Sequence, residues 1–365
     1  MAHTGLTTMR VLGAGSMTVL CTAIIVSAFT LPGLAAANDR RILTQALDPY
    51  QSEPPLSGTL TIAGSETMQP MVTKMATEFR RLHPDVTFAI EGEGSASAIR
   101  EFALGISLQR RGDKSRQGHD GANRLQVLAS SRPLTDKELQ AFISRHGYEP
   151  LALPVAMDAV TIYVNVDNPI GGLTLEQVAA IFGKRGADRV TTWGHVGLNT
   201  GWEKQAIHLY GRDEKSGTRE FFIQTVLKGE SLKPDIHEEP GTASEILAIA
   251  RDPLGIGYAG AGLNTSFVRA VPVAERADSA FVPPSIESVV NGTYPLRRAL
   301  YLYVDPGSRK DKMDPVVAAF LKFVNSQEGQ NVVVRAGFFP LTAAMANKNK
   351  ELLNGGSAAA LLSRR

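Results

Sequence analysis

Two spacings of apolar residues succeed each other in the first part of the chain. Short β-branched and apolar runs predict strands over residues 59–63 and 86–90. Apolar residues three and four positions apart predict a helix over 68–82 and a second helix that begins within 94–97 and extends through Leu104. Because strand and helix alternate, we expect a parallel sheet covered by helices.

The alternation continues toward the C-terminus. Further strands are predicted near 125–128, 155–166, 207–210, 254–259 and 298–304. Helices are predicted to begin after the expected N-cap Thr174 and at 216–218, and a last amphipathic helix covers 315–325. The whole pattern predicts an α/β fold.

The N-terminal segment has the features of a secretory signal peptide. Arg10 precedes an uncharged, largely apolar run over 11–31, which is followed by Pro32-Gly33 and small residues up to Ala37. We expect cleavage after Ala37, so that residues 1–37 are a signal peptide and 38–57 a leader or linker. The alternative is a retained membrane anchor, since the apolar run is long. Cys21, the single cysteine, lies within this run, and a cysteine-free mature chain suits the periplasm.

Composition narrows the class of protein. The 365 residues are 43% hydrophobic and 20% charged, which excludes a disordered chain and a multi-pass membrane protein. One cysteine excludes a disulfide scaffold. With 38 Lys+Arg against 36 Asp+Glu, the net charge of +2 gives no basic footprint for nucleic acid. The length predicts about two domains.

Candidate chemistry gathers where predicted strands lead into predicted helices. Gly, Ser and Thr residues occupy 64–67, 94–97 and 216–218, each at a helix start. Backbone N–H groups there have no partner within the helix, and together with the helix dipole they favour an anion. Hydroxyl groups add neutral donors, and Arg132 and Arg212 lie close to two such segments. Each segment alone is also explained by ordinary helix capping.

Motifs typical of enzymes are missing from the sequence. We find no G-x-S-x-G, H-E-x-x-H or Walker A pattern, and the histidines after residue 37 have no metal-ligand spacing. We therefore expect no catalytic residue, no metal and no cofactor.

Seven segments, in order, resemble the phosphate-binding protein of bacterial phosphate ABC transporters. They are 64–70 (GSETMQP), 94–95 (GS), 129–138 (ASSRPLTDKE), 156–165 (AMDAVTIYVN), 212–222 (RDEKSGTREFF), 257–258 (GY) and 294–301 (YPLRRALY). The matches extend from about residue 58 to residue 341.

The resemblance implies a type II periplasmic-binding-protein fold, with two lobes joined by two crossover strands. Lobe I would comprise 58–153 with 297–350, lobe II 154–296, and 351–365 a C-terminal tail. The implied hinge lies near 153–158 and 294–298. Phosphate-binding roles are implied for Ser65, Thr67, Met68, Gly94, Ser95, Ser131, Arg132, Arg212, Ser216, Gly217 and Thr218. At Met68 and Gly217 the expected donor is the main chain.

Two departures from the family pattern bear on selectivity and on partners. Many relatives have, where Ser131 stands, an aspartate that accepts the proton of phosphate and repels sulfate; others have Ser-Arg, as here. Glu66 and Asp158 are the candidate replacements, with a solvent-facing Glu66 as the alternative. The basic loop 109–124 is longer than expected; it is either an insertion or a partner contact.

The function expected from the resemblance is capture of inorganic phosphate in the periplasm and its delivery to an ABC permease. We expect a monomeric binding protein that contacts the membrane subunits of the permease and binds no nucleic acid. The alternatives are a binding protein for sulfate or molybdate, a secreted phosphatase that uses Ser65 or Ser216, and a scaffold or adhesion protein on the same fold.

Overall fold

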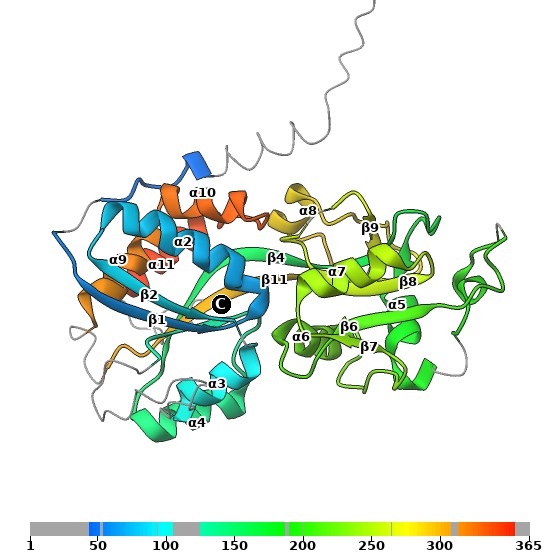
Figure 1. Ribbon diagram of the computed structural model, residues 1–365, viewed down its shortest axis with the longest axis horizontal. Helices are drawn as coiled ribbons and strands as arrows, with labels where there is room; N and C mark the ends of the chain where they lie inside the picture. Colours follow the sequence, from blue (N-terminus) through cyan, green and yellow to red (C-terminus); the bar gives the residue numbers. More distant parts are fainter. Residues whose placement is uncertain are drawn as a thin grey trace, which may run out of the picture.

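The computed structural model describes residues 44–51, 54–92, 94–104, 125–186, 190–199, 201–263, 265–307 and 313–354. The predicted signal peptide, the basic loop 109–124 and the tail beyond residue 354 lie outside these residues. The fold is mixed α/β, and Figure 1 shows its elements arranged in two halves with β4 (Leu151–Asn165) and β11 (Arg297–Val304) passing between them.

In the first half, three parallel strands carry helices on both faces. The strands β1 (Gly58–Gly64), β2 (Val86–Glu91) and β3 (Val127–Ser130) lie in the order β2-β1-β3. One face is covered by α2 (Gln69–Leu82), α9 (Pro315–Val324), α10 (Gln327–Arg335) and α11 (Ala343–Leu353). The other is covered by α3 (Ser95–Leu104) and α4 (Asp136–His146).

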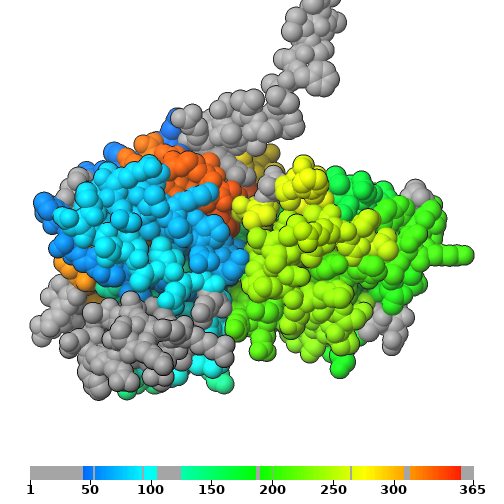
Figure 2. All heavy atoms as spheres, viewed as in Figure 1, coloured from blue at the N-terminus to red at the C-terminus, as the bar shows by residue number. Residues whose placement is uncertain are grey.

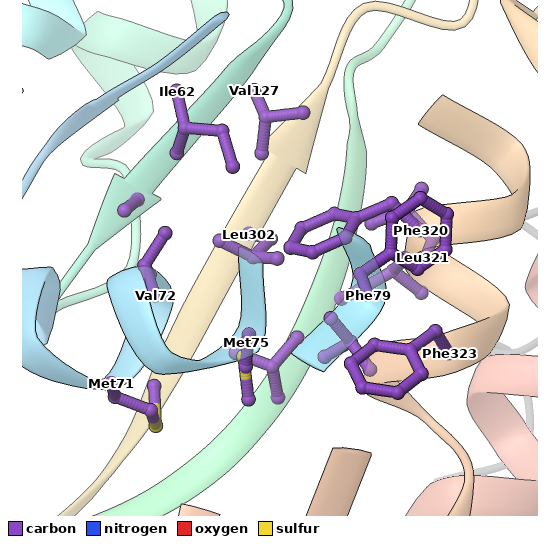
Figure 3. Packing of buried hydrophobic residues seen from close by; sticks show 14 of the residues in the cluster. Ile62, Met71, Val72, Met75, Phe79, Val127, Leu302, Phe320, Leu321 and Phe323 are labelled. Atoms are coloured by element: carbon purple, nitrogen blue, oxygen red, sulfur yellow. The ribbon is translucent and has the colours of Figure 1, made fainter. Parts of the chain in front are cut away.

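Alternation along β1 explains why both faces are covered. Leu60 and Ile62 join the cluster beneath α2 and α9, whereas Ala63 joins the cluster beneath α3 and α4. The first cluster is rich in aromatic rings: Phe79 meets Phe320 and Phe323 edge to face, with ring centroids 5.5 and 5.6 Å apart (Figure 3). Such contacts add to the free energy gained by burying the rings.

The second half repeats this plan with its own core. The strands β6 (His208–Arg212), β7 (His237–Glu239) and β8 (Gly255–Gly260) are parallel, in the order β8-β6-β7. The helices are α5 (Leu175–Phe182), α6 (Gly217–Thr225), α7 (Thr242–Arg251) and α8 (Ile286–Val290). The strands β9 (Val268–Val271), β5 (Leu173–Thr174) and β10 (Val273–Ala274) complete it. As predicted, Thr174 caps α5, accepting a hydrogen bond from the Gln177 N–H.

The strands of the first half are parallel, as predicted from the first part of the chain, but the sheet as a whole is mixed. The strand β11 is antiparallel to both β3 and β4, and β4 is antiparallel to β8. Residues 151–159 of β4 pair with β11, whereas 160–164 pair with β8. One long strand, β4, therefore belongs to both halves, and β11 runs beside it in the opposite direction.

The described part of the predicted leader packs against the first half. Leu47 is buried, and Thr44 Oγ1 donates to Asn331 Oδ1 of α10 at 2.7 Å. The ring of Tyr50 lies edge-on to Phe79 and Phe323. At the other end, α11 continues to Leu353, into the predicted tail. Within the described ranges, no helix has the length and apolar character needed to cross a bilayer.

Candidate functional site

The carboxyl ends of β1, β2 and β3 bring three of the predicted segments to one edge. Because neighbouring parallel strands end at the same edge of a sheet, the loops after them meet. The Gly94 N–H donates to the Gly64 carbonyl at 2.9 Å, and Ser95 Oγ lies 3.4 Å from Ser131 Oγ. Gly64 has φ +142°, and a Cβ there would lie 1.9 Å from the Ala129 carbonyl oxygen. This close approach lets the Ser65 N–H reach the same carbonyl at 2.8 Å.

The carboxyl ends of β6 and β7 place two helix N-termini opposite that edge. Arg212 is the last residue of β6, and α6 begins at Gly217 with Ser216 as its N-cap. Ser216 Oγ accepts hydrogen bonds from the Thr218 and Arg219 N–H groups at 3.2 and 3.3 Å. The helix α7 begins at Thr242, directly after β7. Sequence reasoning did not identify this second N-terminus, because residues 237–242 give only a weak strand signal.

The two edges are in contact. Thr67 Oγ1 of the first half lies 3.0 Å from Thr218 Oγ1 of the second, and both residues are buried. The Ala96 N–H donates to the Lys215 carbonyl at 3.3 Å. Figure 2 shows the halves meeting along their boundary, where blue atoms of the first half lie against yellow and green atoms of the second half. The predicted hydroxyl groups therefore form one interface between the halves.

Gly217 lets the start of α6 approach the first half very closely. A Cβ at this position would lie 2.6 Å from Ser131 Oγ and 2.7 Å from Ser95 Oγ. Real side chains do not tolerate such distances, so only glycine lets the α6 N-terminus sit against these two hydroxyl groups. The result is that main-chain N–H donors of the second half face hydroxyl donors of the first.

Arg212 is paired with Glu66, which comes from the opposite half. Arg212 Nη2 lies 2.9 Å from Glu66 Oε2, and it also donates to the Pro240 carbonyl, while Nη1 donates to Thr242 Oγ1. Glu66 in turn accepts from the Thr242 N–H at the start of α7. Glu66 thus contacts the second half while 23% of its side chain stays exposed, and a helix N-terminus stabilises its charge.

Arg132 is paired within its own half. It makes a bidentate contact with Glu138, both bonds 2.8 Å long, and Nη1 also donates to the Pro133 carbonyl. Burial alone would raise the pKa of Glu138, but the bonds from Arg132 and from Thr135 hold it below its usual range. Glu138 also closes the capping box of α4 with Thr135. The guanidinium of Arg132 is therefore tied to the start of α4.

A third arginine, Arg298, is paired with Asp158 at the crossing of β4 and β11. The two residues are direct neighbours across these strands. Arg298 Nε and Nη2 donate to Asp158 Oδ2 at 3.0 and 2.8 Å, and Asp158 Oδ1 accepts from the Ala261 N–H at 3.0 Å. Arg298 Nη2 also donates to Thr218 Oγ1 at 2.9 Å. This arginine is thereby connected to the hydroxyl interface.

Sequence reasoning assigned no role to Arg298, although the strand pattern contained a signal. Arg298 and Leu300 face the same side of β11 and are buried, whereas Arg297 is exposed. A charged residue at an inward position of a strand needs a partner, and Asp158 occupies the same kind of position in β4. Only the register of the two strands shows that they are partners.

Glu245 is a further buried carboxyl near Arg212. It lies on α7, its Oε1 accepts from the Tyr258 N–H at 2.9 Å, and its Oε2 is buried without a hydrogen-bond partner in the described residues. Burial raises the pKa of Glu245 to about 8, against the smaller opposing effect of Arg212. At neutral pH this carboxyl is therefore mostly protonated, and Arg212 keeps Glu66 as its charged partner.

Met68 lies in the turn that follows β1. Its N–H donates to the Ser65 carbonyl at 3.1 Å within the short helical turn η1 (Glu66–Met68), and its side chain belongs to the core of the first half. Of the residues at this turn, Glu66 and Thr67 both reach the opposite half with their side chains.

The groups that meet between the halves are mainly hydrogen-bond donors, together with the carboxylates that pair with the arginines. Hydroxyl groups come from both halves, and N–H groups come from the start of α6. Each of the three arginines has a carboxylate partner and one buried nitrogen without a partner among the described residues: Arg132 Nε, Arg212 Nε and Arg298 Nη1. Within those same residues, no cluster of His, Cys, Asp and Glu is arranged to hold a metal ion. Such a donor set binds an oxyanion.

Comparison with known proteins agrees with this fold. Residues 49–328 match the PBP superfamily domain. The chain is 38% identical over 324 residues to the phosphate-binding protein PstS of Pseudomonas aeruginosa, covering 88% of this chain and 94% of the relative. It is 27% identical over 331 residues to protein SphX of Synechococcus elongatus, covering 90% and 88%.

Solved structures share the fold at lower identity. A putative phosphate ABC transporter substrate-binding protein from Clostridium perfringens, solved with bound phosphate, aligns with a TM-score of 0.62 at 23% identity, over 78% of this chain and all of that one. A possible phosphate-binding protein from Planctomyces limnophilus aligns with a TM-score of 0.58 at 24% identity, covering 82% and 99%. The chain belongs to the PBP superfamily and, within it, to the family of PstS-type phosphate-binding proteins.

Proposed function

We propose that this protein is the phosphate-binding component of a phosphate ABC transporter: it captures inorganic phosphate between two lobes outside the cytoplasm and delivers it to the membrane subunits of a permease. The observation that carries the proposal is the contact between Thr67 and Thr218, which places hydroxyl groups of one half against the α6 N-terminus of the other. Both P. aeruginosa PstS and the C. perfringens structure carry phosphate in their names.

The two-lobed arrangement is part of this proposal. We assign lobe I to 58–153 with 297–350 and lobe II to 154–296, with β4 and β11 as crossover strands. The separate hydrophobic cores of the two halves support this division. A signal peptide over 1–37 and a periplasmic location complete the assignment, in keeping with an N-terminal apolar run that ends in small residues.

Phosphate would contact Ser65, Thr67, Met68, Gly94, Ser95, Ser131, Arg132, Arg212, Ser216, Gly217 and Thr218. Ser95, Ser131 and Gly217 are mutual neighbours, as are Thr67 and Thr218. Neutral donors and a helix N-terminus carry most of the contact, because the arginines are already paired with carboxylates. A dianion is then held without a large excess of buried positive charge.

Binding, and not hydrolysis, follows from how the serines are used. Ser216 Oγ accepts two N–H bonds as the cap of α6, and Ser65 lies at the start of η1. A serine nucleophile needs a neighbouring base to take its proton. The relatives named above are binding proteins by name.

The proposal is tested by calorimetric titration of the protein with phosphate, sulfate, arsenate and molybdate. A ligand that binds only the folded state also raises thermal stability as its concentration exceeds Kd. We expect heat and stabilisation with phosphate well below the concentration at which sulfate acts. Preference for sulfate or molybdate would assign the site to another oxyanion, and turnover of a chromogenic phosphate ester would support the phosphatase alternative.

A further inference from the structure

Arg298 is connected to the proposed phosphate site through one hydroxyl group. Its Nη2 donates to Thr218 Oγ1, and that oxygen lies 3.0 Å from Thr67 Oγ1. Thr218 is in the first turn of α6, whose N–H groups favour an anion. An oxygen held by the hydroxyl groups of Thr67 and Thr218 would therefore lie beside the guanidinium of Arg298.

The guanidinium is fixed in place on several sides. Asp158 accepts hydrogen bonds from Nε and Nη2, and the centre of the Phe221 ring lies 5.4 Å from the guanidinium carbon. Asp158 is itself held by the Ala261 N–H and is fully buried. Gly260 permits close packing here, because a Cβ at this position would lie 2.9 Å from the Thr67 methyl group and 3.0 Å from Asp158 Oδ2. Thr67 and the Asp158–Arg298 pair are thus packed into one corner.

One donor of this guanidinium has no partner within the part of the chain that the structure describes. Arg298 is 4% exposed, and its Nη1 is buried without a hydrogen bond. Leaving a charged donor buried and unpaired is costly. A buried ion pair is weak evidence for a role in stability, because well-packed apolar residues serve as well. A role in ligand binding accounts for both the charge and the free donor.

We propose that Arg298 is a phosphate-binding residue, which donates from Nη1 to an oxygen of the bound dianion, with Asp158 as the residue that positions it. This inference rests on the proposed function. It also gives Asp158 a role other than accepting the ligand's proton, because both carboxylate oxygens already accept hydrogen bonds.

The test compares phosphate titrations of the wild type, Arg298→Gln and the matched control Arg297→Gln. Arg297 is the exposed neighbour on the same strand. We expect Arg298→Gln to weaken phosphate binding by about 10- to 100-fold, the usual worth of a charged hydrogen bond. Arg297→Gln should stay within about twofold of the wild type.

Arg298→Gln leaves Asp158 buried without its partner, so the double variant Asp158→Asn with Arg298→Gln is measured in parallel. It removes both charges and should show the same loss of phosphate affinity. If neither folds, Arg298→Lys decides: it keeps the charge but not the guanidinium fork, and an affinity equal to the wild type's overturns the proposal.

A second readout separates binding from a merely structural role. Removing a cation that contacts the ligand should reduce the preference of the site for the phosphate dianion over the monoanion. This preference is measured as the gain in phosphate affinity when the pH rises through the second pKa of phosphate. A folded double variant with wild-type affinity and an unchanged gain overturns the proposal for Arg298. If the wild type itself binds no phosphate, the proposed function fails first, so the two failures are distinguishable.

Discussion

Glu66 and Arg212 form an ion pair 2.9 Å long between the two halves of the protein, although they lie 146 positions apart in the sequence (212 − 66). Arg212 ends β6 in the second half, and Glu66 begins the turn after β1 in the first. The residue with the clearest sequence signal for binding an anion is therefore already bonded to a carboxylate. Its charge is balanced, and its guanidinium is oriented by Glu66, Thr242 and the Pro240 carbonyl.

We predict that Arg212→Lys weakens phosphate binding by about 1.5–3 kcal/mol, because lysine keeps the charge but loses the planar fork. The matched control is Arg251→Lys, an exposed arginine at the end of α7. Calorimetric titration measures both. Unchanged phosphate affinity in Arg212→Lys would remove Arg212 from the site.

Selectivity should depend on a carboxylate near the ligand. Sulfate and the phosphate dianion carry the same charge, but only phosphate has a proton to donate. We predict that Glu66→Gln raises sulfate affinity much more than it changes phosphate affinity, because a negative group that sulfate must meet is removed. Competition titrations give the sulfate/phosphate ratio. The hypothesis fails if Glu66→Gln leaves this ratio as it was.

Gly217→Ala should impair binding without unfolding the protein. The added Cβ would meet Ser131 Oγ and Ser95 Oγ at 2.6 and 2.7 Å, so the halves must separate at this point. We expect at least about a tenfold loss of phosphate affinity. Gly171→Ala, where an added Cβ meets nothing within 4 Å, is the control. Equal affinities in the two variants would contradict the close approach of α6 to these serines.

Phosphate should make the protein more compact by bending the strands that join the halves. We place the hinge near 153–158 and 294–298. Pro154 lacks an N–H for the ladder, and the pairing register of β4 and β11 shifts between Leu300 and Tyr301, so the sheet is locally irregular there. Small-angle scattering should give a smaller radius of gyration with phosphate than without. An unchanged radius at saturation would mean that the unliganded protein is already closed or that the hinge lies elsewhere.

Glu245 should make stability fall as pH rises. Its pKa is raised from 4.5 in the unfolded chain to about 8 in the folded protein, chiefly by burial. Between these two pH values the unfolded chain binds fewer protons at this carboxyl than the folded protein does. The free energy of unfolding therefore falls by up to about 1.4 kcal/mol per pH unit as the pH rises. We predict that Glu245→Gln removes this slope in the free energy of unfolding. Denaturant titrations from pH 4.5 to 8 measure it, and parallel curves would contradict the prediction.

The sequence by itself determined the α/β pattern, most of the helices and strands, and the glycine- and hydroxyl-rich segments after strands. These features are local: apolar period, helix caps such as Thr174 and the small residues at 64–67 act within a few positions of one another. Because the carboxyl ends of parallel strands share an edge, the meeting of Gly64, Ser95 and Ser131 also follows from local pattern.

Only the tertiary structure decided which charges are partners. The pairing of Arg212 with Glu66 requires the two halves to touch, and that of Arg298 with Asp158 requires the register of two antiparallel strands 140 positions apart. The mixed sheet arises in the same way, because β4 and β11 pair although most of the second half lies between them in the sequence. Such contacts depend on long-range geometry, and no local spacing in the sequence encodes the distance between two side chains brought together by different elements.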